Sequence, residues 1–223
     1  MAKQWVRCLL VGAMLALSVG SAQAVVVYTN LGEATWIGGG STATSFANGS
    51  ALAQSFTTDA NYYKLNSATL LMNQSEGASV ANVTIWSDDT LGGAFPAGMG
   101  DGPLAQLFAL NTTAVTTLGL YTFNAPTYFE LAPNSTYWVV LASSNNIGTF
   151  NWEATESTAS TGPVTSVSFA NGIPGNWTVA DNSLGPYKME LDATTVPEPS
   201  TYALLVISLG VVGYARKRMN TKA

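Results

Sequence analysis

The sequence predicts an all-β protein: a two-layer antiparallel β-sandwich of jelly-roll-like type, with an N-terminal signal peptide and a short C-terminal hydrophobic helix. Between residues 25 and 192 the chain is rich in Gly, Ser, Thr and Asn. Its apolar residues come in short β-branched and aromatic runs, separated by turn residues about every ten positions. Several runs alternate apolar and polar residues, as half-buried strands of a sandwich do. No amphipathic helix pattern is present in this region.

Each predicted strand is bounded by residues that favour turns, mainly Gly, Pro, Asn, Asp and Ser. In chain order, the predicted strands are 53–57, 68–72, 80–86, 104–110, 119–123, 127–131, 136–142, 149–153, 164–169 and 187–191. Because successive side chains of a strand point to opposite faces, Trp86 is expected on the face opposite to Val83 and Ile85. The turn Ala132-Pro133-Asn134-Ser135 is a typical connection, since Pro presets one corner and Asn closes local hydrogen bonds.

The N-terminal segment has the three regions of a secretory signal peptide. Lys3 and Arg7 precede an apolar stretch at 8–19, and Ala22-Gln23-Ala24 follows as a cleavage site. We expect signal peptidase to remove residues 1–24, so that the mature chain begins at Val25. The single cysteine, Cys8, lies in the removed segment, so the body has no thiol nucleophile, no thiolate metal ligand and no disulfide.

The body is acidic and poor in reactive side chains. Residues 25–196 hold 12 Asp or Glu and 2 Lys, a net charge of 2 minus 12, or −10. Such a charge disfavours nucleic acid and anionic lipid as partners. The chain has no histidine, so general-base and zinc chemistry would have to do without it. We therefore expect no enzyme and no resident cofactor, and residues 25–192 are long enough for one domain.

The C-terminal segment has the order of a membrane-sorting signal. A polar tether at 193–196 is expected to lead into residues 197–223, which begin with Pro197-Glu198-Pro199, directly after Val196. An apolar run at 202–215 and then Arg216-Lys217-Arg218 follow. As a helix, this run would be about 21 Å long, shorter than the roughly 30 Å hydrocarbon core of a bilayer. A short span suits a segment that is to be cut off, and the basic cluster would stay cytoplasmic.

This order of motif, apolar helix and basic cluster resembles the PEP-CTERM tail of Gram-negative bacteria. The resemblance implies that an exosortase recognises Val196, Pro197, Glu198 and Pro199, with Arg216, Lys217 and Arg218 as the stop-transfer cluster. It also implies an inner-membrane-anchored intermediate and a final place at the cell surface or in the extracellular matrix, linked to exopolysaccharide or biofilm.

The body itself resembles the extracellular domains called choice-of-anchor, type R. The resemblance is carried by the segments 53–58, 83–88, 131–140 and 187–189. These domains have no assigned activity, so the resemblance implies a β-sandwich fold and no particular function.

Two groups of residues are candidates for ligand binding. Trp36, Trp86 and Trp177 are the candidates for exposure, and exposed indoles stack sugar rings in many β-sandwiches. Packing in the core or at an edge is the commoner arrangement for any one of them, and Trp138, in an apolar strand, is expected in the core. Asp88, Asp89 and Asp101 bracket a Gly-rich loop, and carboxylates on a loop are calcium ligands. Their spacing fits no EF-hand, and turn-capping aspartates are the simpler interpretation.

The leading hypothesis is an exported, non-enzymatic surface or matrix protein. The alternative is a carbohydrate-binding module that uses loop aromatics, with or without calcium. An ice-binding protein would need a regular Thr-rich repeat, which the sequence lacks. A carboxylate hydrolase would need two carboxylates across a substrate, and Glu153 and Glu156 are too close in sequence to straddle one.

Overall fold

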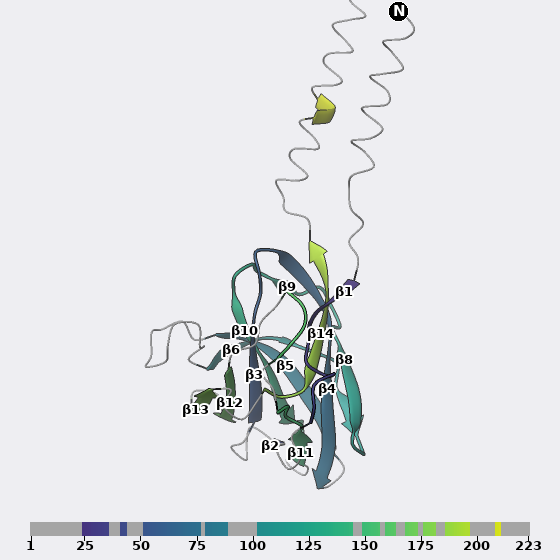
Figure 1. Cartoon of the computed structure of the whole chain (residues 1–223), viewed down its shortest axis with the longest axis vertical. Helices are drawn as coiled ribbons and strands as arrows, with labels where there is room; N and C mark the ends of the chain where they lie inside the picture. The colour runs from purple at the N-terminus through teal and green to yellow at the C-terminus, as the bar shows by residue number, and fades with distance from the viewer. Residues whose placement is uncertain are drawn as a thin grey trace, which may run out of the picture. The chain divides into compact units, whose positions relative to one another are not determined.

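The computed structural model describes residues 24–35, 41–43, 51–76, 79–88, 102–144, 149–156, 159–163, 168–173, 176–181, 186–196 and 208–210. The chain divides into two compact units. Ala24–Thr194 forms one, called the body below, and Met1–Gln23 together with Thr195–Ala223 forms the other. The body consists of two antiparallel β-sheets with an apolar cluster between them (Figure 1).

The first sheet is centred on one long strand, β4, which has neighbours on both sides. Its order is β1 (Ala24–Thr29), β14 (Met189–Val196), β4 (Tyr62–Glu76), β11 (Thr149–Trp152) and β2 (Ser41–Ala43), and both β8 (Gly119–Asn124) and β9 (Glu130–Leu131) also pair with β4. Figure 1 shows β1 beside β14, so the first and last strands of the body are neighbours.

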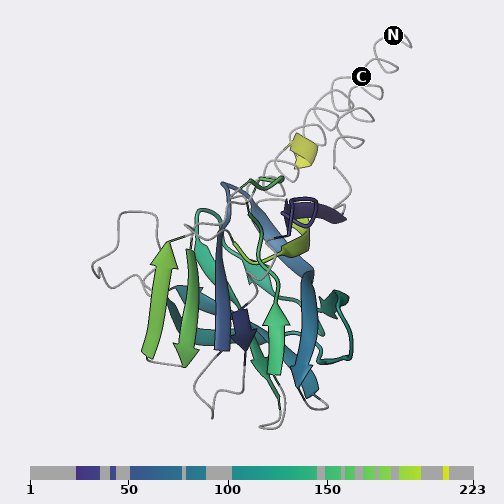
Figure 2. The same ribbon diagram turned by 60° about the horizontal axis from the view of Figure 1, so that its bottom comes forward.

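The second sheet runs from one hairpin to an edge formed by two short strands. Its order is β13 (Asn176–Asp181), β12 (Ser168–Ile173), β3 (Ala51–Thr57), β10 (Thr136–Ser143), β5 (Ser79–Asp88) and β6 (Pro103–Ala109), and β7 (Thr113–Val115) also pairs with β5. Figure 2 shows the β12–β13 hairpin as the two light green arrows at one edge. The predicted all-β, two-layer antiparallel sandwich is confirmed.

Several strands differ from the sequence prediction. β2 and β7 have three residues each, too few for an alternating pattern to be recognised. β1 and β13 were also not predicted. The expected strand at 127–131 is strand only at Glu130–Leu131. The expected strand at 164–169 is partly outside the described residues, and β12 extends beyond it to Ile173.

The interior cluster is built from the inward residues of both sheets. On β10, Tyr137, Val139 and Leu141 belong to it. On β4, Tyr63 and Leu65 are buried, and so is every second residue from Ala68 onward. Two successive half-buried residues lie between these two sets, so the alternation shifts by one position. The strand thereby pairs first with β9 and then with β8. Full burial of each large apolar side chain stabilises the fold by roughly 1.5–3 kcal/mol.

Residues 193–196, expected to be a tether, instead continue β14 as far as Val196. Ala193 is fully buried, and Thr194 accepts a hydrogen bond from Nδ2 of Asn66 at 3.0 Å. The sequence Asp192-Ala193-Thr194-Thr195 resembles a polar linker because, in this part of β14, only every second residue is buried and the others are polar.

Within the described part of the second unit, Ser208–Gly210 is helical. Most of the expected hydrophobic helix at 202–215 lies outside the described residues, as do residues 1–23 of the expected signal peptide. Among the described residues, we find no helix long and apolar enough to cross a membrane.

Candidate functional site

A second apolar cluster lies on the outer face of the β10 sheet, where the aromatic candidates meet. It comprises Ala51, Ala53, Trp86, Trp138, Val140 and Ala142, with Trp177 packed against it. We call it the tryptophan cluster. Its members alternate along β3, β5 and β10 with residues of the interior cluster, so both faces of these strands are covered.

Small residues on β3 leave the space that the indoles occupy. Trp86 and Trp138 are cross-strand neighbours on β5 and β10. Trp177 comes from β13, and its ring meets that of Trp86 edge-on, with centroids 6.2 Å apart and planes at 78°. In the sheet order, three strands separate β13 from β5. A flat sheet would place β13 and β5 about 19 Å apart, at 4.8 Å per strand, so the sheet curves toward this face.

Each indole N–H of the tryptophan cluster has a different environment. Nε1 of Trp86 donates to Oγ1 of Thr84 at 2.7 Å, and Nε1 of Trp138 donates to Oδ1 of Asp88 at 2.7 Å. Nε1 of Trp177 is buried and has no hydrogen-bond acceptor in the part of the chain that the structure describes. A buried donor without an acceptor costs roughly 1–3 kcal/mol.

Trp86, one of the candidates for exposure, is instead packed, since only 5% of its surface is accessible. The alternation along β5 placed it correctly on the face opposite to Val83 and Ile85, but that face carries its own apolar cluster. The expected core position of Trp138 is confirmed. Trp177 is partly buried, and Trp36 lies outside the described residues. Whether Trp36, Trp86 or Trp177 contacts a ligand stays a prediction.

Of the three predicted calcium ligands, Asp88 alone is described; Asp89 and Asp101 lie outside the described residues. Asp88 ends β5, and its carboxylate accepts the Trp138 hydrogen bond. Over the described ranges, no group of three or more His, Cys, Asp or Glu residues could hold a metal ion. The calcium hypothesis therefore depends on a loop whose other carboxylates are not described.

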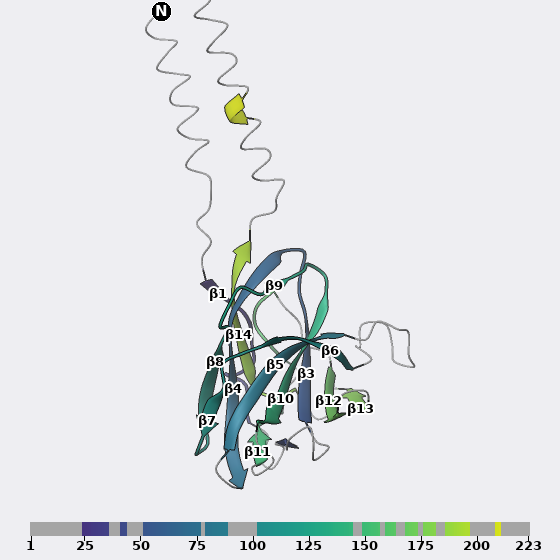
Figure 3. The ribbon, with the colours of Figure 1, turned by 180° about the vertical axis from the view of Figure 1, so that it is seen from behind.

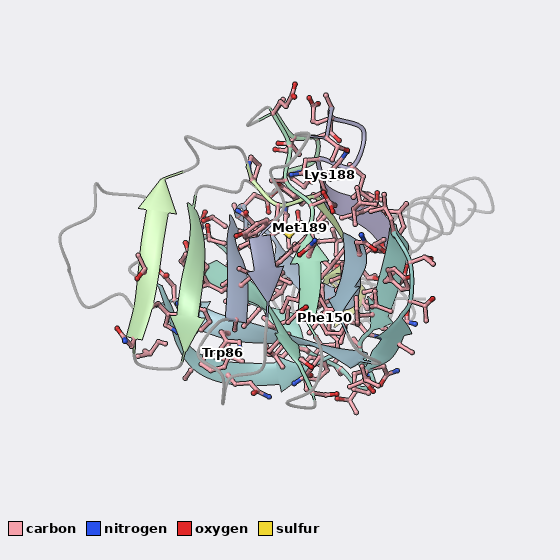
Figure 4. All side chains as sticks on the ribbon, turned by 90° about the horizontal axis from the view of Figure 1, so that it is seen from below. Trp86, Phe150, Lys188 and Met189 are labelled. Atoms are coloured by element: carbon pink, nitrogen blue, oxygen red, sulfur yellow. The ribbon has the colours of Figure 1, made fainter. Side chains whose placement is uncertain are left out.

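Lys188 is nearly buried, with 4% of its surface exposed (Figure 4). Its Nζ donates to the carbonyl of Glu33 at 2.6 Å and to Oγ1 of Thr35 at 2.9 Å. Its own carbonyl accepts a bond from Nε1 of Trp152 at 2.9 Å. These contacts anchor the loop after β1 to the interior, which is a structural role for one of the few amines of the body.

Two further polar side chains bind the backbone of Tyr187 and Met189, one from the residue after β1 and one from β3. Asn30 donates from Nδ2 to the carbonyl of Tyr187 at 2.9 Å and accepts from the amide of Met189 at 2.8 Å. Oε1 of Gln54, on β3, accepts from the amide of Tyr187 at 3.0 Å. Sequence reasoning missed both residues, because a buried Asn or Gln has no distinctive pattern.

Three tyrosines have shifted pKa values, each for a local reason. Burial raises the pKa of Tyr63, and a hydrogen bond with Asp59 adds to the shift. The backbone of Thr117 and of Thr116 lowers the pKa of Tyr121, because their amides donate to its hydroxyl oxygen. A hydrogen bond from its hydroxyl to the Glu130 carboxylate raises the pKa of Tyr128. The shifts follow from separate contacts and do not define an acid–base pair.

The two ends of the body leave from one strand pair. Ala24 is paired with Thr194 and Val25 with Ala193, so the predicted signal-peptide cleavage site lies in β1, against β14. Ala22 lies outside the described residues, as do Pro197, Glu198, Pro199 and the cluster Arg216, Lys217 and Arg218. Val196 is the last residue of β14. The sorting motif therefore begins at the end of a paired strand.

Comparison with known proteins identifies the tail. Residues 195–218 match the family model described as the PEP-CTERM protein-sorting motif. No curated protein and no solved structure matches the chain. The motif implies an exported protein that an exosortase processes. The resemblance of the body to choice-of-anchor domains is not supported.

Proposed function

We propose that this chain is delivered to the cell surface or the extracellular matrix, where its body is displayed as a non-enzymatic component associated with exopolysaccharide. The match of residues 195–218 to the sorting motif carries the proposal. That match starts at Thr195, within β14. Processing at the two ends would release a sandwich whose new termini are strand partners.

The composition of the body supports a role without catalysis. The chain has no histidine, and its only cysteine is Cys8, in the predicted signal peptide. The amine of Lys188 is engaged with a carbonyl and a hydroxyl in a nearly buried position. A general base or nucleophile would therefore have to come from carboxylates, hydroxyls or Lys64.

Polysaccharide is the partner we propose for the displayed body. The net charge of −10 between residues 25 and 196 disfavours polyanions such as nucleic acid. Trp177 and Trp36 are the aromatic contacts to test, because Trp86 is buried. Pull-down with the exopolysaccharide of the source bacterium should retain the unaltered protein. If Trp36→Ala and Trp177→Ala both abolish retention, the protein acts as a carbohydrate-binding module; if retention is unchanged, the association is not mediated by these aromatics.

The sorting step can be tested with a tag placed after Ala223. In cells that contain an exosortase, the tag should be lost from the mature protein while the body persists in the envelope or matrix fraction. A variant with Pro197→Ala, Glu198→Ala and Pro199→Ala provides the matched control and should keep its tag. Equal tag retention in the unaltered chain and in the control would contradict the proposal.

A further inference from the structure

The first strand of the body, β1, consists of two halves that are held differently. The register of β1 against β14 shifts between Val26 and Tyr28, which leaves Val27 as one extra residue on β1. Such a β-bulge interrupts the hydrogen-bond ladder and bends the strand. Figure 3 shows β1 beside β14, from the side opposite to that of Figure 1.

The half before the bulge, residues 24–26, is called the arm below. Its side chains are exposed, Val25 at 43% and Val26 at 40%, and none of them belongs to the interior cluster. Because β1 is the end strand of its sheet, the arm has β14 as its only strand partner within the described ranges. The arm can therefore leave β14 without taking a side chain of its own out of the core.

The half after the bulge is fixed on both sides. Tyr28 is fully buried in the interior cluster. Thr29 pairs with β14 on one side and with Thr161 on the other. The Thr29 amide donates to the Thr161 carbonyl at 2.9 Å, and the Thr161 amide donates to the Thr29 carbonyl at 2.8 Å. Residues 159–163, called the strap below, thus hold this half of β1 as a neighbouring strand would.

Gly162 brings the strap close to the bulge. Its φ is +112°, in the region that favours glycine. A Cβ built on Gly162 would overlap the carbonyl oxygen of Val27. The close contact between the strap and β1 therefore extends from Thr29 to Val27, the bulge itself.

The arm contains the bond that signal peptidase is expected to cut. That bond joins Ala24 to Val25, which are paired with Thr194 and Ala193 of β14. A protease binds its substrate as an extended strand, so a bond already paired with β14 is protected. Cleavage of a folded chain follows the population of its opened state when reclosing is fast.

We propose that the arm opens from β14 as a hinged unit that pivots at Val27, and that it presents the bond between Ala24 and Val25 to signal peptidase while the rest of the body stays folded. Water hydrolyses that peptide bond, which leaves a carboxylate on Ala24 and a free amine on Val25. The strap prevents the opening from extending past the bulge. Removal of the signal peptide therefore does not have to be complete before the body folds. The hinge is a property of the body, whereas its processing role rests on the predicted cleavage site, so the two are tested separately.

Disulfides between β1 and β14 test which half has to open. In a Cys8→Ser background, Val26→Cys with Asp192→Cys forms the arm lock, and Thr29→Cys with Glu190→Cys locks the half after the bulge. Both are opposed pairs of the register. Opposed residues of an antiparallel pair lie at disulfide distance. Each oxidised variant is compared with its own reduced form, which controls for the substitutions themselves.

The assay adds purified signal peptidase to the folded full chain, made by cell-free synthesis in detergent, and sequences the new N-terminus. The unaltered chain should be cut before Val25. The oxidised arm lock should slow cleavage about tenfold or more, and reductant should restore the rate, whereas the other lock should change it less than about twofold. Equal slowing by both locks, unslowed cleavage with the arm locked, or cleavage only after unfolding in urea would overturn the proposal. Cleavage at another bond would overturn the processing role.

Amide hydrogen exchange, measured by NMR on the same full chain, tests the hinge without any cleavage. The arm amides that bond β14 should exchange at least about 100-fold faster than the Thr29 amide, because they open locally. Gly162→Ala should displace the strap and speed exchange at Thr29 about tenfold or more.

Gly32→Ala is the matched control for Gly162→Ala, since a Cβ at Gly32 meets no described atom within 4 Å. It should leave exchange at Thr29 unchanged. Equal protection of the two halves of β1, or unchanged exchange at Thr29 in Gly162→Ala, would contradict the hinge and overturn the proposal.

Discussion

Trp152 in the interior cluster and Trp138 in the tryptophan cluster are both fully buried, yet their surroundings differ. The ring of Trp152 stacks on Tyr187 at 4.8 Å between centroids, and its N–H donates to a backbone carbonyl of Lys188. Trp138 donates to a carboxylate, and Trp177, in the same cluster, has a buried N–H without an acceptor among the described residues. Trp152 therefore relies on a backbone acceptor, whereas Trp138 relies on a side-chain acceptor.

This difference indicates where the molecule tolerates change. A backbone acceptor stays in place as long as the sheet exists, so the Trp152 hydrogen bond is insensitive to surface substitutions. A side-chain acceptor such as Asp88 is lost by one substitution, and a buried indole with no acceptor among the described residues contributes a cost to the fold. The tryptophan cluster should therefore be the less stabilising of the two, although it holds three of the four tryptophans that the structure describes.

The largest expected effect comes from the interior. Trp152→Ala removes the stack on Tyr187 and leaves a cavity between the sheets, so the free energy of unfolding should fall by about 3–5 kcal/mol. Urea denaturation of the exported protein, followed by circular dichroism, measures it. Asn151→Ala changes the adjacent half-buried residue and is the control. A loss at Trp152 below about 1 kcal/mol would contradict the assignment of this residue to the main core.

An intermediate effect is expected for Trp138→Phe, which keeps an aromatic ring but removes the donor to Asp88. The lost hydrogen bond should account for about 1.5 kcal/mol, at the lower end for bonds to charged groups because Asp88 is half-buried, and the smaller apolar surface of Phe adds to the loss. A double-mutant cycle with Asp88→Ala isolates the bond, and the coupling energy should be close to the value for the lost hydrogen bond. Additive effects of the two substitutions would show that the bond contributes nothing.

The sequence was sufficient to predict the strands with long alternating runs. β5 and β10 were predicted almost to their ends, because Val83 and Ile85 alternate with polar neighbours and 137–142 is continuously apolar. The end of β14 was not predictable, since Ala193 becomes buried and Thr194 half-buried only through pairing with β1 and contact with Asn66. Long-range partners decided these boundaries, and no local pattern records them.

Whether the site predictions were correct depended on whether the outer face of the second sheet is open to solvent or covered by other side chains. Alternation correctly set Trp86 against Ile85, but a period-two pattern does not reveal that both faces are buried. The small residues Ala51 and Ala53 on β3 were the available signal, since an outward face without bulk invites large side chains from neighbouring strands.

The smallest expected effect is that of Trp177→Phe, and it sharpens the comparison most. It makes the same substitution as Trp138→Phe, but at an indole whose N–H has no acceptor among the described residues. Trp177→Phe removes a buried N–H that has no acceptor among the described residues, and this gain offsets the smaller apolar surface of Phe. The free energy of unfolding should change by less than about 0.5 kcal/mol in either direction, against at least about 1.5 kcal/mol for Trp138→Phe. Urea denaturation of both variants side by side measures the difference. If Trp177→Phe costs as much as Trp138→Phe, the indole nitrogen of Trp177 has a bonding partner, and the two tryptophans stabilise the outer face equally.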